Sequence, residues 1–265
     1  MFDALYIGAT GMQAQQLNVE TIANNLANAS TVGFKKGRVG FSDLIARESS
    51  RITQQSAEDL RAGVLGAQQR LGAGVGVSSL SKIFDSGELR KTGAPFDVAI
   101  SGEGFLEVTM PDGSSAYTRG GSLNVNKDGL LATQAGHPLR PAIAVPDNAQ
   151  SLVIGADGRV LIKLPYQAAA IEAGQIELVR FTGTGQLGAQ GDNLYRATEA
   201  SGQAIGVRAG EDGAGTLAQG FLEGSNVKMV DEMVNLMLAQ RAYEASVKVV
   251  QAADEMLGLV NNLRK

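Results

Sequence analysis

The chain contains no cysteine, no tryptophan and only one histidine, His137, among its 265 residues. Without cysteine it has no disulfide, thiol nucleophile or thiolate metal site. A single histidine excludes a site with several histidine ligands, and any catalytic triad would have to use His137. That residue precedes Pro138 in a loop signal, where a lone histidine is usually structural or solvated. We therefore predict no metal site and no cofactor.

Long apolar runs and a basic charge balance are also missing. No stretch approaches the roughly 20 apolar residues of a membrane-spanning helix. Residues 1–5 lack the basic segment and apolar core of a secretory signal. The formal net charge is −4, whereas nucleic-acid-binding domains are usually basic. We expect a protein that is cytoplasmic or exported without a cleavable signal, and that binds no nucleic acid.

Proline is confined to the middle of the chain, between Pro95 and Pro165. This distribution predicts helical ends and a turn-rich centre. The expected fold class is α+β, with long N- and C-terminal helices that form a coiled-coil core and a central, mainly antiparallel β domain. The predicted divisions are an N-terminal assembly helix (1–34), an extended linker region with partial helix or strand (35–80), the β domain (81–224) and a C-terminal assembly helix (225–265).

The last stretch, residues 225–265, carries a ladder whose steps alternate between four and three residues. Its positions are Met229, Met233, Leu236, Gln240, Tyr243, Val247, Val250, Asp254 and Leu257. Seven of the nine are apolar or aromatic, which is typical of a coiled-coil seam. Ser225 or Asn226 is expected to cap this helix, which could run roughly 55 Å.

The first stretch carries a second heptad row, formed by Leu5, Met12, Val19 and Leu26, with Ile22 between the last two. The rest of this helix is rich in uncharged Asn and Gln, including Gln15 and Asn18, and Asp3 and Glu20 are the only charged residues before Lys35. Such a surface fits against other protein or along a wet channel better than in open solvent. The apolar residues of both ladders are predicted to form an assembly interface, and Gln15 and Asn18 a channel or seam face.

The connecting segments have less distinctive patterns. Gly33 is expected at a left-handed turn, and the basic residues Lys35, Lys36 and Arg38 in a solvated loop. Residues 43–49 are predicted as a possible short helix. The glycine-rich run at 71–77 lacks the ending of a phosphate-binding loop, so a strand is favoured there.

Residues 96–181 show the alternation and the evenly spaced Asp-Gly turns of a β domain. The turns are expected at residues 111–113, 127–129 and 156–158, and residues 211–213 are expected as the last loop before the C-terminal helix. Residues 117–119, Tyr-Thr-Arg, are interpreted as a cross-strand polar cluster.

Carboxylates of the β domain offer the one enzymatic alternative. Glu103 and Glu107 would share one face of a strand, as a glycosidase pair does, while Asp97 and Asp112 belong to turns. Exposed glutamates on a sheet show the same pattern, so a carboxylate-dependent enzyme is the less favoured interpretation.

Residues 23–35, Ala-Asn-Asn-Leu-Ala-Asn-Ala-Ser-Thr-Val-Gly-Phe-Lys, resemble the N-terminal signature of bacterial flagellar rod and hook proteins. Residues 223–227, Glu-Gly-Ser-Asn-Val, and 240–244, Gln-Arg-Ala-Tyr-Glu, resemble the C-terminal partner motif. The motif residues are Asn24, Asn25, Asn28, Gly33, Phe34, Ser225, Asn226 and Arg241. Residues 97–100, 102–105, 116–119 and 136–139 are similar to the rod-type β domain, so the resemblance covers nearly the whole chain.

Within this family, the length and residues 136–143 are most similar to the distal-rod branch. Residues 47–70 do not closely follow that branch, which leaves a proximal-rod or hook-type paralogue open. The resemblance implies a non-enzymatic subunit that assembles into the helical tube of the basal-body rod, with the terminal helices inside and the β domain outside. Such a tube crosses the periplasm, transmits torque and encloses the export channel.

The resemblance also implies the partners. They are further copies of the chain, proximal-rod and hook subunits at the two ends, the surrounding outer-membrane and peptidoglycan ring proteins, and the flagellar export apparatus. Export through that apparatus agrees with a chain that has no cleavable signal.

Overall fold

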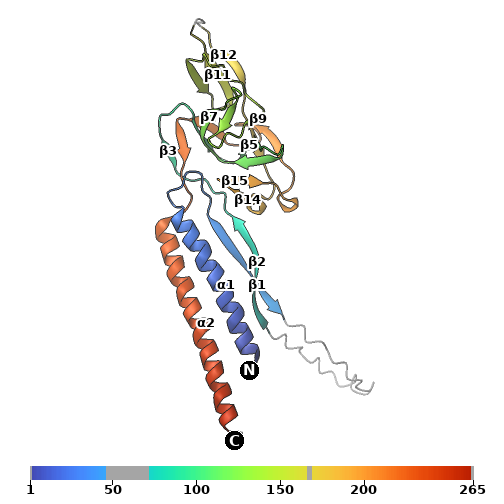
Figure 1. The fold of residues 1–265 in the computed structure, drawn as a ribbon, viewed down its shortest axis with the longest axis vertical. Coiled ribbons are helices and arrows are strands. Elements are labelled where there is room, and N and C mark those ends of the chain that lie inside the picture. The colour runs from blue at the N-terminus through green and yellow to red at the C-terminus, as the bar shows by residue number, and fades with distance from the viewer. Residues whose placement is uncertain (1, 46–71, 166–168, 264–265) are drawn as a thin grey trace, which may run out of the picture. The chain divides into compact units, whose positions relative to one another are not determined.

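The computed structural model describes residues 2–45, 72–165 and 169–263 (Figure 1). The chain forms two compact units. The first, which we call the helical unit, consists of Met1–Thr21, Val39–Leu80 and Val234–Lys265. The second, the β unit, consists of Ile22–Arg38 and Ser81–Met233.

A long helix stands at each end of the chain, as the sequence predicts. Helix α1 covers Phe2–Ala27 and helix α2 covers Met229–Leu263. Two strands, β1 (Gly37–Ile45) and β2 (Gly72–Lys82), pair with each other. The strand expected in the glycine-rich run is confirmed as the start of β2. The short helix expected at 43–49 is wrong at residues 43–45, which belong to β1, and its remainder lies outside the described residues.

Small residues let the two helices approach closely within the helical unit. A Cβ atom on Gly8 would lie 2.6 Å from Val250 Cγ2, and Gly11 faces Ser246. In Figure 1, α1 (blue) and α2 (orange to red) lie side by side. Glycine weakens an isolated helix by about 1 kcal/mol relative to alanine, so these two residues are explained by packing rather than by helix propensity.

The other side of α1 meets the β1–β2 pair. The Val75 amide donates to the Thr10 hydroxyl at 3.4 Å. Gly74 has φ +109°, and a Cβ atom there would collide with Thr10 Oγ1. Glycine is therefore required at residue 74 for both its backbone conformation and the close contact with α1.

The β unit contains the remaining strands. They are β3 (Leu89–Lys91), β4 (Asp97–Ser101), β5 (Phe105–Thr109), β6 (Ser115–Thr118), β7 (Gly120–Val125), β8 (Leu131–Thr133), β9 (Leu139–Arg140), β10 (Ser151–Ile154), β11 (Arg159–Lys163), β12 (Ile171–Gln175), β13 (Glu177–Arg180), β14 (Gly188–Gly191), β15 (Leu194–Arg196), β16 (Ile205–Arg208), β17 (Thr216–Gln219) and β18 (Phe221–Glu223). Short 3₁₀ helices occur at Thr184–Gln186 and Glu199–Ser201. The strands form sheets in the orders β14-β15-β6-β5-β13-β16, β17-β4-β7-β8, β10-β11-β12 and β18-β3, and β9 also pairs with β5.

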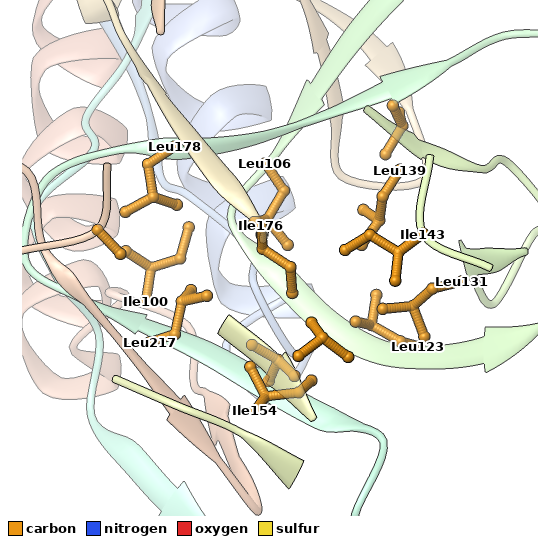
Figure 2. Packing of buried hydrophobic residues seen from close by; sticks show 14 of the residues in the cluster. Ile100, Leu106, Leu123, Leu131, Leu139, Ile143, Ile154, Ile176, Leu178 and Leu217 are labelled. Atoms are coloured by element: carbon orange, nitrogen blue, oxygen red, sulfur yellow. The ribbon is translucent and has the colours of Figure 1, made fainter. Parts of the chain in front are cut away.

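One apolar core is shared by all of these sheets except β18-β3. Its buried side chains come from most of the strands and include Ile100, Leu106, Leu131, Ile143 and Leu178 (Figure 2). Alternation along the strands supplies them: in β10, Leu152 and Ile154 are buried and the residues beside them are exposed. A second cluster is aromatic, with Phe84, Phe105, Tyr117, Phe181 and Tyr195 packed edge to face.

The three predicted Asp-Gly turns are confirmed, because Gly113, Gly129 and Gly158 all have positive φ. Residues 211–213 also form a turn, with Asp212 and Gly213 at positive φ. The expectation that this turn leads directly into the C-terminal helix is wrong. Strands β17 and β18 come first, and β17 pairs with β4 at Leu217–Ile100.

Candidate functional site

The main polar feature of the β unit is a buried ion cluster that begins at Lys35. Gly33 follows α1 with φ +70°, and its amide donates to the Glu223 carbonyl at 2.8 Å. This turn directs Lys35 into the β unit, where its side chain is fully buried. Its Nζ donates to Glu223 Oε1 at 2.8 Å and to the Asp85 carbonyl at 2.7 Å. The expectation of a solvated loop is therefore wrong for Lys35.

Glu223, the last residue of β18, is the anion of the cluster. Its side chain is 2 % exposed. Besides Lys35, it accepts from Arg119 Nε at 3.1 Å and from the Gly87 amide at 2.9 Å. Glu223 therefore joins three segments that are far apart in the sequence.

Arg119 is the second buried cation and connects β6 to β7. It donates to the carbonyl oxygens of Gly104 at 2.6 Å and Gly102 at 2.9 Å, in addition to Glu223. The interpretation of residues 117–119 as a cross-strand cluster is confirmed for Tyr117 and Thr118, which pair with residues of β5 and β15. It is wrong for Arg119, which follows β6 and whose side chain is only 2 % exposed. Burial of two cations around one carboxylate leaves this cluster with a formal charge of +1.

Burial and mutual charge shift the ionisation of these groups. Burial lowers the pKa of Lys35 below its ordinary value of 10.5, although the Glu223 carboxylate opposes that shift. Burial alone would raise the pKa of Glu223, but Arg119 and Lys35 outweigh it, so this pKa lies below 4.5. Burial, and then the nearby charge of Glu223, raises the pKa of the Tyr195 phenol to about 12.

Asn25, near the end of α1, bonds both backbone groups of Gly37, as a residue of a neighbouring strand would. Its amide nitrogen donates to the Gly37 carbonyl at 2.9 Å, and its oxygen accepts from the Gly37 amide at 2.8 Å. The same nitrogen donates to the Glu232 carboxylate at 3.1 Å. This buried residue thus connects α1 to the first residue of β1 and to the first turn of α2.

Asn226, from the C-terminal motif, also uses its side-chain amide to bond backbone groups, here those of Lys36 and Ile83. Its oxygen accepts from the Lys36 amide at 2.8 Å and its nitrogen donates to the Ile83 carbonyl at 2.8 Å. The expectation that Asn226 or Ser225 caps the C-terminal helix is wrong, because α2 begins at Met229. The Ser225 hydroxyl instead accepts from the Val227 amide at 3.2 Å.

We call this set the junction: Lys35, Arg119 and Glu223 with Asn25 and Asn226. It joins the segment after α1, the segment before α2 and the body of the β unit. Its charged and amide groups are occupied by one another and by backbone groups. Such an arrangement can hold segments together, and it presents no free nucleophile or acid to a substrate.

Acid should weaken the junction. The depressed pKa of Glu223 contributes stability above pH 4.5, which is lost as pH falls through the lower pKa of the folded state. We therefore expect the difference in unfolding free energy between the wild type and Glu223→Gln, measured in urea, to shrink from pH 7 to pH 3. A difference that stays constant over this range would contradict the assignment.

The predicted ladder on α2 is divided between two faces. Leu236, Val247, Val250 and Leu257 are half-buried, on the side of the buried Ala239 and Ala253 that faces α1. Met229, Met233 and Tyr243 are exposed, as are Gln240 and Asp254. The opposite side of α2 carries a set that the ladder missed, which we call the outer face: Val234, Met237, Leu238, Val249, Met256 and Leu259. Each of these side chains is at least 44 % exposed.

The predicted interface residues of α1 are less exposed. Leu5, Met12, Val19 and Leu26 are half-buried and Ile22 is buried. Gln15 and Asn18 are half-buried and hydrogen-bonded to each other at 3.4 Å. They follow Gly8 and Gly11 by seven residues each, so they lie on the α1 face directed at α2.

The other motif residues are placed near the junction or on the surface. The Asn28 side chain donates to Asn24 Oδ1 at 2.8 Å and accepts from the Thr31 hydroxyl, so Asn24 and Asn28 stabilise the C-terminal end of α1. Phe34 is buried, with Lys82 Nζ 4.5 Å from its ring centre. Arg241 is exposed on α2 and pairs with Glu244 at 3.0 Å.

The carboxylates considered for catalysis have ordinary structural partners. Glu103 pairs with Arg180 at 2.8 Å, and Glu107 pairs with Arg140 at 3.4 Å. Asp97 accepts from Thr92, and Asp112 from Ser114. The His137 amide donates to the Thr133 hydroxyl at 3.3 Å. Among residues 2–45, 72–165 and 169–263, no group of three or more His, Asp or Glu is placed to hold a metal ion.

The junction itself was missed by reasoning from local pattern. Lys35 stands in a short basic run, and Glu223 follows two apolar residues at the end of a strand. One signal was present: Lys35, Arg119 and Glu223 all lie in the motif stretches that carry the family resemblance. Their shared role required the three-dimensional contacts.

The fold and the junction define a structural protein whose terminal helical segments are tied into a β body. Models of three flagellar families match the chain. "Flagella basal body rod protein" matches residues 5–35, "Flagellar hook protein FlgE/F/G D1 domain" matches 99–162, and "Flagellar basal body rod FlgEFG protein C-terminal" matches 218–263. These matches contain Lys35, Arg119 and Glu223, respectively.

Relatives of known name match over the whole length. The flagellar basal-body rod protein FlgG of Borreliella burgdorferi is 43 % identical over all of this chain and all of its own length. FlgG of Caulobacter vibrioides is 42 % identical over 98 % of this chain and 99 % of its own, whereas FlgF of that organism is 32 % identical over 98 % and 100 %. The chain belongs to the flagellar basal-body rod protein family.

This membership confirms the predicted family, and the higher identity to FlgG confirms the distal-rod branch over the FlgF paralogue. The protein is a structural subunit of the rod in the flagellar basal body. In the described part of the chain, no helix is both long enough and apolar enough to cross a membrane.

Proposed function

We propose that the chain assembles into a helical homopolymer that forms the distal rod, with its terminal helices as a coiled-coil assembly core. The outer face of α2 carries this proposal, because six large apolar side chains remain uncovered on one helix. Groups of exposed apolar side chains with polar residues around them mark sites of protein–protein contact. In this proposal, residues 1–34 and 225–265 assemble, residues 35–80 connect, and the β domain of residues 81–224 lies outside.

The assembly core combines two kinds of contact. Small residues, Gly8, Gly11 and Ala239 among them, pair α1 with α2 of the same chain. The larger residues Met229, Met233 and Tyr243 are then available to neighbouring copies. Arg241 is the motif residue placed to choose among those neighbours by charge.

Gln15 and Asn18 belong to the seam rather than to a channel wall in this proposal. Their half-buried position on the α1 face directed at α2 supports it. Uncharged amides can be desolvated there at lower cost than charged groups.

The remaining parts of the proposal rest on family membership. The subunit contacts proximal-rod and hook subunits at the ends of the rod, ring proteins around it and the export apparatus, and it encloses the export channel. It has no enzymatic role. The junction suits torque transmission, because its buried ionic contacts hold Lys35, Arg119 and Glu223 of the β unit together.

Electron microscopy of the purified chain tests the proposal. The full-length chain should form filaments, whereas a chain reduced to residues 22–233 should stay a folded monomer. This truncation keeps the whole junction, so the thermal transition of the β unit serves as a folding control. A full-length chain that remains monomeric at every concentration would contradict self-assembly.

A further inference from the structure

The helical unit contains a groove between α1 and the β1–β2 pair. Its volume is about 590 Å³. Residues of both elements line it, among them Tyr6, Leu17, Leu44 and Val77. Tyr6 and Val77 are exposed, so the groove is open, and Thr10, Gln13 and Gln16 stand among its apolar residues. Among the described residues that line the groove, Glu20 is the one that carries a charge.

The outer face of α2 has the complementary character. Arg241 and Lys248 interrupt its apolar residues at helical spacing, seven residues apart. Arg241 pairs with Glu244, but both side chains are mostly exposed. A solvent-exposed pair of this kind contributes little stability, so Arg241 is free to exchange partners on assembly.

We propose that the outer face of α2 in one copy of the chain docks into the α1/β1–β2 groove of the next copy, with Arg241 directed at Glu20. This inference rests on the proposed self-assembly and names the two surfaces that meet. A ridge of apolar and basic residues then covers a groove whose lining combines apolar residues, uncharged polar residues and the acidic Glu20. The charges select the ridge as the partner of the groove.

The lengths of the two surfaces agree. The lining residues of α1 run from Tyr6 to Glu20, which is about 21 Å of helix. The outer face from Arg241 to Met256 is about 22 Å long, has Arg241 at the end that meets Glu20, and contains both basic residues. One groove therefore accepts this half of the ridge.

A contact between two different surfaces can repeat without limit. Such a heterologous interface generates an open helical polymer when the rotation between copies does not close a ring. Pairing of two outer faces with each other would instead close as a symmetric dimer. The presence of both a ridge and a groove on one unit favours the open contact, which is what a rod requires.

Charge reversal tests the contact in the full-length chain. We expect Glu20→Arg and Arg241→Glu each to raise the critical concentration for filament formation, measured by sedimentation, by about tenfold, the change that corresponds to about 1.4 kcal/mol. The double variant restores opposite charges in every contact and should return close to the wild-type value.

Lys127→Glu and Asp128→Arg are matched controls, because they reverse one charge of each sign in an exposed turn of the β unit. Both should assemble like the wild type. Single ridge or groove reversals that assemble like these controls would overturn the inference, as would a double variant no better than the single ones.

Cysteine cross-linking tests the same contact without relying on charge. The chain has no cysteine of its own, so Val77→Cys and Leu238→Cys variants each carry one thiol. After the two purified variants are mixed, assembled and oxidised, we expect covalent dimers containing one chain of each. Dimers of Leu238→Cys alone would show that two outer faces meet and would overturn the inference.

The two proposals fail in different ways. Wild-type filaments that are insensitive to both reversals and give no mixed cross-link would overturn the docking but leave self-assembly intact. A wild-type chain that forms no filament would overturn self-assembly, and the docking with it.

Discussion

Replacing Glu223 by glutamine is expected to lower the unfolding free energy of the β unit by about 4 kcal/mol, the typical cost of breaking a buried ion pair. The change is nearly isosteric, so packing is retained. What is lost is the anion between Lys35 and Arg119, whose side chains are 0 % and 2 % exposed. Two buried cations would then face each other without compensation. Urea unfolding followed by circular dichroism measures the effect.

A second substitution separates charge from packing. Lys35→Met in the wild type removes the surplus cation and leaves a balanced Arg119–Glu223 pair, so it should cost only about 1–2 kcal/mol, the value of a lost hydrogen bond to a buried group. In the Glu223→Gln background the same substitution should increase stability. Glu103→Gln, at an exposed pair with Arg180, is the control and should change stability by less than about 1 kcal/mol. Equal losses at Glu103 and Glu223 would contradict the role of burial.

A single methyl group at Gly87 is expected to be nearly as harmful. A Cβ atom there would collide with the Gly224 carbonyl, which belongs to the backbone and cannot rotate away. The Gly87 amide also donates to Glu223 at 2.9 Å. We expect Gly87→Ala to lower the unfolding free energy by about 3 kcal/mol and to reduce filament formation, because residues 224–226 lead into α2.

Gly93→Ala is the matched control for that substitution. Gly93 has φ +74°, but a methyl group would meet no atom within 4 Å. The left-handed conformation alone costs alanine about 1 kcal/mol. If Gly87→Ala were no more harmful than Gly93→Ala in thermal unfolding and filament formation, close contact at Gly87 would not be the reason for its glycine.

Local sequence pattern was sufficient to predict the terminal helices and the tight turns, because residues close together in the sequence determine both. The helices at both ends follow from heptad spacing, and turns such as the one at Gly113 follow from the need for positive φ. The face by which α1 and α2 pair was harder to predict, because heptad patterns are recognised from large apolar residues and this contact is made by small ones. Gly8 and Ala239 mark the actual intramolecular contact, and the large residues of the outer face point away from it.

The junction could not be predicted from local pattern for a different reason. Lys35 reads as part of a basic loop, since the residue that neutralises it is 188 positions away. Asn226 reads as a helix cap, since asparagine before a helix usually is one. Its backbone partners, Lys36 just before β1 and Ile83 just after β2, lie beside it only in the folded chain. Burial of charge is thus the property that sequence pattern conveyed least.

The long separations within the junction have a consequence for the order of folding. Glu223 bonds to Lys35 and Arg119, which precede it by 188 and 104 residues. Contacts so distant along the chain close late, because a large loop must be ordered first. During synthesis from the N-terminus, Lys35 and Arg119 emerge long before their anion. The growing chain can therefore complete the β unit only after Glu223 has been synthesised. Until then Lys35 and Arg119 lack their carboxylate partner.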